Sequence, residues 1–527
     1  MTTFNLVDLF EQAVDEWPDR TYIVDDHQRR TYRELDERAN QLAHHLAAGG
    51  VGPGDHVGIY ALNRVEWVET LWAVFKLRAV WININYRYVE DELSYLFNDA
   101  DLTYLIVEPE FVQRAAAAAP DLPQLVIGQE YETAMAGHST SRDFAPRSGD
   151  DRYVLFTGGT TGMPKGVVWR HEDVLMALGG GIDIRSGEKV TAPEGFLTKG
   201  RNGFHLTAFP IAPLMHGATQ WSVMGQSFVG NTTILRAKFD AADAWATVAK
   251  EKVNLLMITG DAMARPLLDE LDGNKSAYDL SSLFAISSSA VLFSQTCKDQ
   301  FLDQLPNLVI TDAIGSSESG ANGITMVTRG THMAGGPTVT AASDTTVLDD
   351  DLNPIPVGSS AVGRLARSGN LPIGYHNDPV KTAATFVIAT NGIRYAMPGD
   401  YARIEPDGSI TLLGRGSVSI NTGGEKVFPE EVENALKGHP QVFDAVVVGV
   451  PDERWGQRVT AVIQPRHRTD PPTLESVQEH CRNHIAGYKI PRAVVIVDEM
   501  VRSPSGKSDY RWALAQAEAR LNRPAVS

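Results

Sequence analysis

The feature that most limits the fold is an alternation of helical and strand patterns from residue 4 to about residue 360. An amphipathic helix is predicted at 35–48, ending at Gly49 and Gly50, and the apolar stretch 56–62 follows it as a strand. A second helix is predicted at 67–77 and a second strand at 103–108. Alternation of this kind favours an α/β fold in which helices and largely buried sheets form layers.

The pattern changes after about residue 345, where short alternating runs at 409–415, 445–450 and 458–464 are separated by Gly, Pro and Asp. Such runs are typical of a smaller α+β unit. A chain of 527 residues also exceeds what one hydrophobic core normally holds. We therefore predict a large N-terminal domain of several subdomains over 1–414 and a small mobile C-terminal domain over 415–527, with a last helix at 509–521.

The formal net charge of −18 disfavours nucleic acid or an anionic membrane as the main partner. Two cysteines, Cys297 and Cys481, are too few for a disulfide framework or a thiolate metal site, and we interpret both as buried apolar residues. Asp8 and Glu11 interrupt the first apolar run, which excludes a signal peptide, and no apolar run approaches the ~20 residues of a membrane span. We expect a cytoplasmic protein without an integral membrane segment.

The stretch LFTGGTTGMPKGVV, residues 155–168, lies between two apolar runs that predict the strands of a hairpin. Its glycines allow several backbone N–H groups to point to one place, and threonine hydroxyls and Lys165 add further donors. This composition suits a polyphosphate. The P-loop pattern fails, because Lys165 follows Pro164, precedes Gly166 and is followed by a strand. A glycine-rich hairpin without a ligand remains the alternative, since such loops are common.

Four other stretches give the loop a context: ITDAIGSSESG (310–320), YAMPGDYARI (395–404), LLGRGSVSINTGGEKVFPEEVE (412–433) and RSPSGKSDYR (502–511). With them, nearly the whole chain resembles the adenylate-forming superfamily, which includes acyl-CoA synthetases, amino-acid-activating domains and firefly-type luciferases. It most resembles actinobacterial acyl-CoA synthetases that activate fatty acids and sterol side-chain acids. The narrower likeness rests on WRHED, HGATQ, TGDAMARPL, YDLSSLF, IAGYK and DYRWA.

The resemblance implies that ATP activates a carboxylic acid as an acyl-adenylate, with Mg²⁺, and that coenzyme A then takes the acyl group. It assigns the β- and γ-phosphates to Thr157, Gly159, Thr160, Thr161, Gly162 and Lys165. Glu318 and Thr160 are the expected Mg²⁺ ligands, and Ser317 is expected to bind the α-phosphate. Adenine is expected against Asp312 and Ile314, and ribose against Asp400 and Arg415.

The resemblance also implies that one site serves two steps in turn. Lys507 is expected to reach the first-step site and neutralise charge in the transition state. The small domain then rotates about a hinge near Ser417 and presents Gly423, Gly424 and Lys426 to the thiol. Without the motif around it, Lys507 has the ordinary interpretation of a solvated lysine.

The acid pocket is expected to include His216, Gly217, Gly260, Asp261, a turn at 287–290 with Ser288 and Ser289, and Gly315. Amino-acid-activating relatives carry an aspartate in the stretch that corresponds to 210–221 here, where this chain has His216. The absence of that aspartate favours an acyl substrate: a medium- or long-chain fatty acid or a sterol side-chain acid. A hydrogen-bonded structural histidine is the alternative for His216. Segment 179–204 is either a mobile lid or a surface insertion.

Three other functions stay open: loading of a phosphopantetheinyl carrier protein, a non-catalytic nucleotide-binding relative, and, least favoured, luminescence. A homodimer is left open as the assembly.

Overall fold

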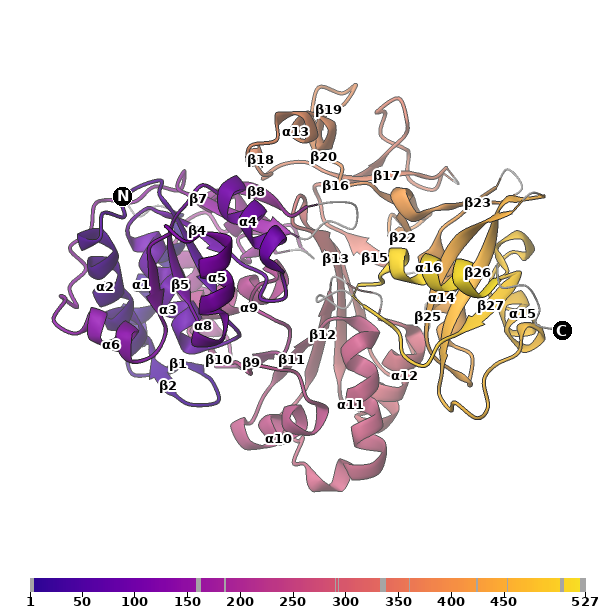
Figure 1. Cartoon of the computed structure of the whole chain (residues 1–527), viewed down its shortest axis with the longest axis horizontal. Coiled ribbons are helices and arrows are strands. Elements are labelled where there is room, and N and C mark those ends of the chain that lie inside the picture. Colours follow the sequence, from indigo (N-terminus) through magenta and orange to yellow (C-terminus); the bar gives the residue numbers. More distant parts are fainter. Residues whose placement is uncertain are drawn as a thin grey trace.

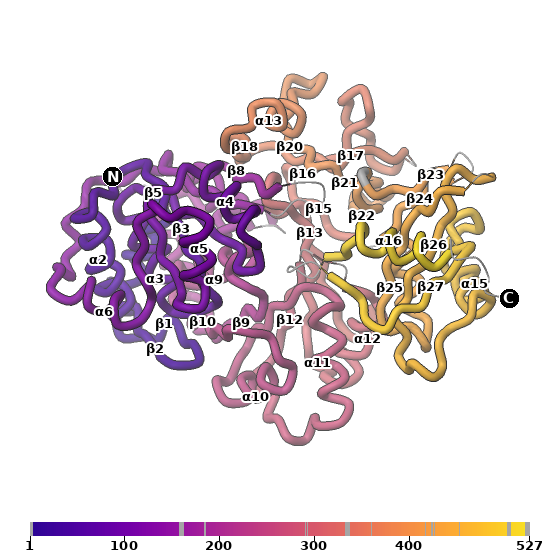
Figure 2. The backbone as a smooth tube through the Cα atoms, in the orientation of Figure 1, coloured from indigo at the N-terminus to yellow at the C-terminus, as the bar shows by residue number. Residues whose placement is uncertain are grey.

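The computed structural model describes residues 4–157, 163–183, 186–289, 291, 293–331, 338–359, 361–422, 425–452, 454–502 and 507–521. Within them the strands form three sheets, two in a large N-terminal domain and one in a small C-terminal domain, which lie side by side in Figure 1. Figure 2 follows the same path as a tube, from indigo at the N-terminus to yellow at the C-terminus. The expected α/β architecture with a large and a small domain is confirmed.

The first sheet has seven strands in the order β18-β8-β7-β4-β3-β5-β6. Its strands are β3 (His56–Tyr60), β4 (Val80–Asn83), β5 (Leu102–Val107), β6 (Gln124–Val126), β7 (Arg152–Thr157), β8 (Lys165–Arg170) and β18 (Gly374–Tyr375). Strands β6, β5, β3, β4 and β7 run parallel, and β7 and β8 form the predicted antiparallel hairpin. Helices of this region are α1 (Leu6–Glu16), α2 (Tyr32–Ala48), α3 (Val65–Lys76), α4 (Glu90–Asp99), η1 (Pro109–Phe111), α5 (Val112–Ala118), α6 (Gln129–Met135) and α7 (His171–Leu178).

The second sheet has fifteen strands and joins a parallel part, β1-β10-β9-β11-β12-β13, to an antiparallel part that ends at β19. Its strands are β1 (Thr21–Val24), β2 (Arg29–Thr31), β9 (Thr207–Pro210), β10 (Thr232–Ile234), β11 (Leu255–Ile258), β12 (Ala285–Ser289), β13 (Val309–Ser316), β14 (Gly320–Val327), β15 (Thr338–Ala341), β16 (Thr345–Leu348), β17 (Gly363–Arg367), β19 (Phe386–Ile388), β20 (Arg394–Ala396), β21 (Asp400–Ile404) and β22 (Ile410–Arg415). Its helices are α8 (Glu194–Asn202), α9 (Gly217–Phe228), α10 (Ala241–Glu251), α11 (Gly260–Asn274), η2 (Lys275–Ala277), α12 (Gln295–Gln304) and α13 (Pro379–Thr385).

The small domain has a five-stranded sheet made of β23 (Ile420–Thr422), β24 (Glu425–Val427), β25 (Val442–Asp452), β26 (Gly456–Pro465) and β27 (Ala493–Ile496). Helices α14 (Pro429–Lys437), α15 (Leu474–Arg482), η4 (Gly487–Lys489) and α16 (Tyr510–Leu521) accompany it. Within the described residues the chain leaves the second sheet at Arg415, passes through η3 (Gly416–Val418) and starts the small sheet at Ile420. The predicted boundary between residues 414 and 415 stays a prediction.

The strongly periodic helices form because each has one apolar face and a polar cap. In α1, Leu6, Phe10 and Ala13 are fully buried, and the Asn5 side chain accepts a hydrogen bond from the Val7 N–H. The Phe10 ring stacks on Trp72 of α3 with 4.4 Å between centroids. The predicted helix at 509–521 is also present, as α16, and both cysteines are buried as expected.

One expectation about local structure needs correction. Residues 287–289 lie in strand β12 and not in a turn, because parallel neighbours β11 and β13 provide a ladder on both sides. Segment 179–204 contains helix α8, whose Phe196 is buried against Phe228, and its two interpretations as a lid or a surface insertion stay predictions. None of the helices in the described ranges combines the length and apolar character needed to cross a membrane.

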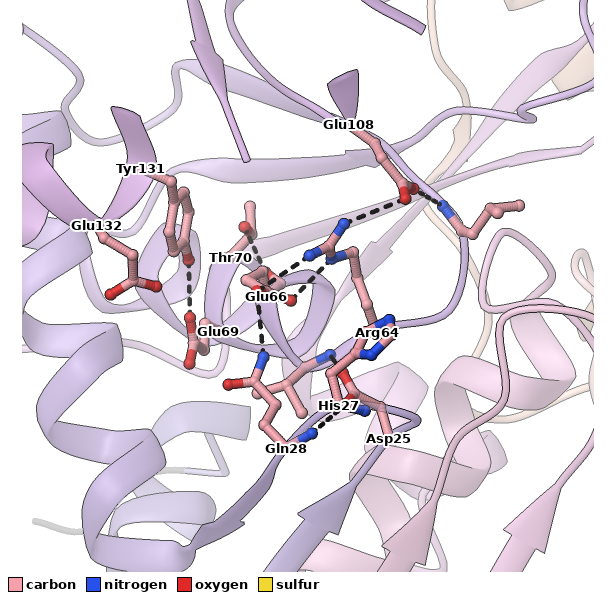
Figure 3. Close-up of polar contacts among 12 residues, drawn as sticks. Asp25, His27, Gln28, Arg64, Glu66, Glu69, Thr70, Glu108, Tyr131 and Glu132 are labelled. Carbon is pink, nitrogen blue, oxygen red and sulfur yellow. Dashed lines mark hydrogen bonds and ion pairs between the residues drawn. The ribbon is translucent and has the colours of Figure 1, made fainter. Parts of the chain in front are cut away.

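Buried charges around α3 join the N-terminal helices to the first sheet. Arg64 donates from Nε to Glu66 at 2.8 Å and from Nη1 to Glu108 at 3.1 Å, as Figure 3 shows. The carboxylate of Glu69 is fully buried and accepts hydrogen bonds from Arg38 Nε at 2.5 Å and from the Tyr131 hydroxyl at 3.0 Å. These groups already have protein partners, so the cluster is structural.

Because Glu69 is completely buried, Arg38→Met should leave its carboxylate without its main counter-charge. We expect the free energy of unfolding to fall by about 3 kcal/mol, measured by urea denaturation. The control is Arg33→Met, which removes an exposed pair with Asp19 and should cost less than about 1 kcal/mol. Equal losses for the two variants would contradict a structural role for the buried pair.

Candidate active site

The predicted phosphate loop sits at the tip of the β7–β8 hairpin, which ends at the pair Thr157 and Lys165. Residues 158–162 lie outside the described residues, including the predicted Gly159, Thr160, Thr161 and Gly162. Gly166 is required in β8, since a Cβ there would lie 2.8 Å from the Phe156 ring. Two short strands therefore fix the positions of Thr157 and Lys165.

Strand β18 packs beside β8 and orients Lys165. The ammonium of Lys165 forms an ion pair with Asp378 and lies 5.9 Å from the centre of the Tyr375 ring. Register pairs Tyr375 with Val167, and the His376 N–H donates to the Gly166 carbonyl at 2.7 Å. The cation at the loop base is thus held by residues more than 200 positions later in the chain.

Glu318 lies in the turn between β13 and β14, and three contacts hold this turn. The Tyr375 hydroxyl donates to Glu318 Oε1 at 2.8 Å. Trp169 Nε1 donates to the carbonyl of Ser317 at 3.0 Å, and Arg367 Nη1 donates to that of Ser319 at 2.6 Å. Tyr375 therefore connects the hairpin to the Glu318 turn, with Lys165 over its ring and Glu318 on its hydroxyl. Burial raises the pKa of Tyr375, with Glu318 acting in the same direction, so the hydroxyl remains a donor.

Asp400 and Arg415 face each other on the antiparallel pair β21–β22. Arg415 Nε donates to Asp400 Oδ1 at 3.2 Å. Asp400 raises the pKa of Arg415, and Glu318 acts in the same direction. The two predicted ribose-binding residues therefore lie together, within electrostatic range of Glu318.

Lys507 enters the same neighbourhood from the small domain. Burial lowers the pKa of Lys507, and Arg415 contributes in the same direction, whereas Glu318 and Asp400 oppose the change. The structure thus brings together Lys507, Glu318, Asp400 and Arg415, although they are separated by up to 189 sequence positions (507 − 318). Charges of both signs converge there from both domains.

Glu430 of α14 packs against the start of the chain crossing. A Cβ at Gly414, which has φ +123°, would lie 2.0 Å from Glu430 Oε2. Burial raises the pKa of Glu430 to about 8, and the carboxylates of Glu433 and Asp400 act in the same direction, while the Arg415 backbone opposes them. Tyr510 also faces this group. The proton-bound form of Glu430 is favoured in this arrangement.

The carboxyl ends of parallel strands β11, β12 and β13 carry several predicted residues in one row. Register aligns Ile258 with Ser288, Ser288 with Asp312 and Ser289 with Ala313. The Gly260 N–H donates to Ser288 Oγ at 3.1 Å. Ligands commonly bind at such an edge of an α/β sheet.

Residues further along β13 differ in exposure. Asp312 is buried and forms an ion pair with Lys298 at 2.6 Å; burial raises its pKa, and Lys298 opposes this. Ile314 is half-buried, and Gly315 beside it is exposed. Only glycine fits at position 315, because a Cβ there would lie 2.4 Å from the Gly320 carbonyl oxygen.

Asp261 has partners in both domains. Its Oδ1 accepts from the Ser294 N–H at 2.9 Å and hydroxyl at 3.0 Å, within the large domain, and its Oδ2 forms an ion pair with Lys437 Nζ of the small domain at 3.4 Å. The assignment of Asp261 to the pocket wall stays a prediction.

His216 is the N-cap residue of α9 and precedes Gly217, where a Cβ would lie 2.6 Å from Leu155. The histidine lines a water-sized cavity of 10 Å³. The other lining residues are Asn83, Asn85, Tyr88, Leu96, Phe156 and Met215. Asn83 bonds both the N–H and carbonyl of Phe156 at 2.8 Å and the carbonyl of Met215 at 2.7 Å. Asn83 thereby couples the hairpin to the His216 turn.

The predicted thiol-side residues Gly423 and Gly424 lie outside the described residues. Lys426 belongs to β24, and Ser417 to the short helix η3. Sequence reasoning missed Tyr375, Asp378 and Asn83. The signal for the first two was the segment GYHND, whose partners only the sheet order reveals.

Comparison with known proteins finds two matching family models and relatives that cover nearly the whole chain. The model of the AMP-binding enzyme family matches residues 10–374, and that of the AMP-binding enzyme C-terminal domain matches residues 431–507. A 3-oxocholest-4-en-26-oate–CoA ligase of Rhodococcus rhodochrous is 52% identical, covering 98% of this chain and 96% of its own. A medium/long-chain-fatty-acid–CoA/3-oxocholest-4-en-26-oate–CoA ligase of Mycolicibacterium smegmatis is 49% identical, covering 98% and 97%.

Among solved structures, the anthranilate CoA ligase AuaEII in complex with anthranoyl-AMP has a TM-score of 0.86. It is 24% identical and covers 98% of both chains, which shows a shared fold.

The position of Glu430 makes stability dependent on pH. A carboxyl group whose folded pKa is raised contributes stability that is lost as pH rises from its ordinary value of 4.5 through about 8. Glu430→Gln keeps the shape and cannot ionise, so its melting temperature should exceed that of the wild type increasingly between pH 5 and 8.

The control for this prediction is Glu425→Gln, at an exposed site in β24. Its difference from the wild type should stay constant over the same pH range, in thermal melts followed by circular dichroism. A constant difference for Glu430→Gln as well would show that burial does not perturb this carboxyl group.

Proposed function

The chain belongs to the AMP-binding enzyme family, and from this premise we propose that it is an acid–thiol ligase for hydrophobic carboxylic acids. The carboxylate attacks the α-phosphorus of ATP, the bond to pyrophosphate breaks, and acyl-AMP forms. The sulfur of coenzyme A then attacks the acyl carbon, its proton goes to solvent, and AMP leaves. The products are acyl-CoA, AMP and pyrophosphate.

One observation carries this proposal: the buried Lys507 of the small domain lies within electrostatic range of Glu318, Asp400 and Arg415 of the large domain. The first step gathers negative charge from a carboxylate and a triphosphate at one place. A fixed ammonium and a guanidinium at that place stabilise the transition state more than the separated reactants. We assign Lys507 to the reacting carboxylate and α-phosphate, and Arg415 to the ribose and phosphate side.

The hairpin and its neighbours fit the rest of the nucleotide. We assign Thr157, Lys165 and the loop residues 159–162 to the β- and γ-phosphates, and Ser317 to the α-phosphate. The two oxygens of the Asp400 carboxylate suit the two ribose hydroxyls. Adenine is assigned to the edge near Asp312 and Ile314, where the half-buried Ile314 offers an apolar contact and the Lys298 pair holds the Asp312 carboxylate in place.

A Mg²⁺ ion fits the donors at this site. Glu318 offers a carboxylate oriented by the Tyr375 hydroxyl, and Thr160 is the second ligand assigned from the sequence. In the part of the chain that the structure describes, no three His, Cys, Asp or Glu side chains cluster in a way that could hold a metal ion. Phosphate oxygens and water would therefore complete the coordination, which is the usual arrangement for Mg²⁺ with nucleotides. When bound, the ion neutralises phosphate charge.

The acid is proposed to be a sterol side-chain acid or a medium- or long-chain fatty acid. The two relatives above, at 52% and 49% identity over nearly full length, are named for these substrates. We assign the small residues Gly260, Ser288, Ser289 and Gly315, near the carboxyl ends of β11 to β13, to the acyl pocket. His216 and Gly217 are proposed to face the acyl side, with His216 near the route of the thiol.

A two-lobed cycle is the remaining part of the proposal. The small domain turns about the crossing near Ser417 after the first step, withdraws Lys507, and presents Gly423, Gly424 and Lys426 to coenzyme A. Hinges of this kind are a few residues that absorb a change in backbone angles.

The function is tested by pyrophosphate release and coenzyme A consumption with fatty acids of graded length, aromatic acids and sterol side-chain acids. We expect Lys507→Ala to reduce pyrophosphate release at least 100-fold while supplied acyl-AMP is still converted to acyl-CoA. Absence of pyrophosphate release by the wild type across the panel would refute an enzyme. If the acyl group is transferred only to a phosphopantetheinyl carrier protein, then that protein is the acceptor in place of coenzyme A.

Tyr375→Phe removes the hydroxyl that orients Glu318 and keeps the ring beneath Lys165. We expect the rate of acyl-AMP formation to fall about tenfold, with less effect on the melting temperature than on the rate. Tyr395→Phe is the control, because Tyr395 is buried, its hydroxyl accepts from Asn391 Nδ2 at 3.1 Å, and it lies outside the site. Similar rates for the two variants would remove Tyr375 from the site.

A further inference from the structure

A buried ion pair joins the two domains. Lys437, the last residue of α14, has a side chain only 2% exposed, and its Nζ lies 3.4 Å from Oδ2 of Asp261 on α11. Arg265 of the same α11 donates to the backbone carbonyl of Lys437 at 3.3 Å. Figure 1 shows α11 and α12 of the large domain beside the small domain. The end of α14 is therefore held by both a charge and a hydrogen bond.

The large domain fixes its side of this contact rigidly. Oδ1 of Asp261 accepts from the N–H and hydroxyl of Ser294, which is also the N-cap residue of α12. Both donors leave Oδ2 directed at Lys437. Two helices thus determine where the carboxylate stands.

Inside the small domain the charges continue from Lys437 to the loop that bears Lys507. Lys437 Nζ lies 3.6 Å from Asp444 Oδ1 on β25. Asp444 accepts two hydrogen bonds from Arg502, from Nε at 2.7 Å and from Nη2 at 2.6 Å. Arg502 forms an isolated antiparallel β-bridge with Ser508, and its Nη1 donates to Ser508 Oγ at 3.3 Å. Ser508 directly follows Lys507, so Arg502 holds the residue next to Lys507.

Charge balance explains why the contacts from Asp261 through Lys437 and Asp444 to Arg502 depend on the position of the small domain. Lys437 and Arg502 are opposed within the small domain by Asp444 and by Glu433, whose Oε1 accepts from the Val447 N–H at 3.0 Å. Asp261 is the carboxylate that the large domain adds. A buried ammonium that loses an opposing charge is destabilised. The contact therefore favours the arrangement in which Lys507 lies near Glu318.

We propose that Asp261 is a positioning residue for acyl-AMP formation, acting through Lys437, Asp444 and Arg502 on the loop that carries Lys507. The inference rests on the proposed function and extends it. Asp261 contacts no reacting atom in this account. It sets the register of the small domain during the first half-reaction, and the contact opens when that domain turns toward coenzyme A.

The test uses the full chain and measures the two half-reactions separately. Asp261→Asn retains an acceptor for Ser294 and removes the charge that faces Lys437. Pyrophosphate release should fall about tenfold, and conversion of supplied acyl-AMP and coenzyme A to thioester should stay within about twofold of the wild type. A general loss of structure would lower both rates.

The matched control is Glu270→Gln, a carboxylate-to-amide change on the same helix, where the partners Asn274 and Tyr278 belong to the large domain. Both half-reactions of this variant should match the wild type. Lys437→Met is the reciprocal variant. The double variant Asp261→Asn/Lys437→Met should be no slower in the first step than the slower single variant, because both substitutions remove the same Asp261–Lys437 interaction.

Equal loss of both half-reactions, unchanged rates, or additive losses in the double variant would each overturn the positioning role. If Asp261→Asn does not fold, Lys437→Met is judged by the same split between half-reactions. A wild type that releases no pyrophosphate with any acid refutes the proposed function. An active wild type with Asp261→Asn indistinguishable from Glu270→Gln refutes this inference alone.

Discussion

One electrostatic encounter depends on most of the fold of this protein: Lys507 lies within electrostatic range of Glu318, Asp400 and Arg415. Charges of both signs buried together are stable only if each has a partner at a suitable distance. The partners come from different parts of the second sheet and from the far end of the chain. The sheet order, the turn at Glu318 and the docking of the small domain must all be correct before this encounter exists.

In the large domain, short strands position the residues around Glu318. The two-residue strand β18 places Tyr375 where its ring is near Lys165 and its hydroxyl reaches Glu318. Trp169 and Arg367 hold the neighbouring carbonyls of the same turn. The two strand ends that flank the proposed phosphate loop, at Thr157 and Lys165, are thereby held in place by the sheet.

Sequence patterns predicted most of the fold that depends on local order. The faces of α1 and α2, the β7–β8 hairpin and α16 follow from periodicity, glycine positions and caps. The motifs led to the family, which the comparisons confirm, and to the four residues that converge at the site. Residues 287–289 were misinterpreted as a turn, because serines favour turns locally and the parallel neighbours that make them a strand lie elsewhere in the chain. Tyr375, Asp378 and Lys437 were missed for the same reason: their partners are far away in sequence.

The chain passes from the second sheet to the small sheet once, between Arg415 and Ile420, and the described elements after it all belong to the small domain. The small domain is therefore a tethered partner, and the tether replaces diffusion by an effective concentration that for short linkers is on the order of millimolar. Cutting the backbone there would convert an internal encounter into a bimolecular one. At the dilution of most enzymes in solution, the severed halves would meet too rarely to act together.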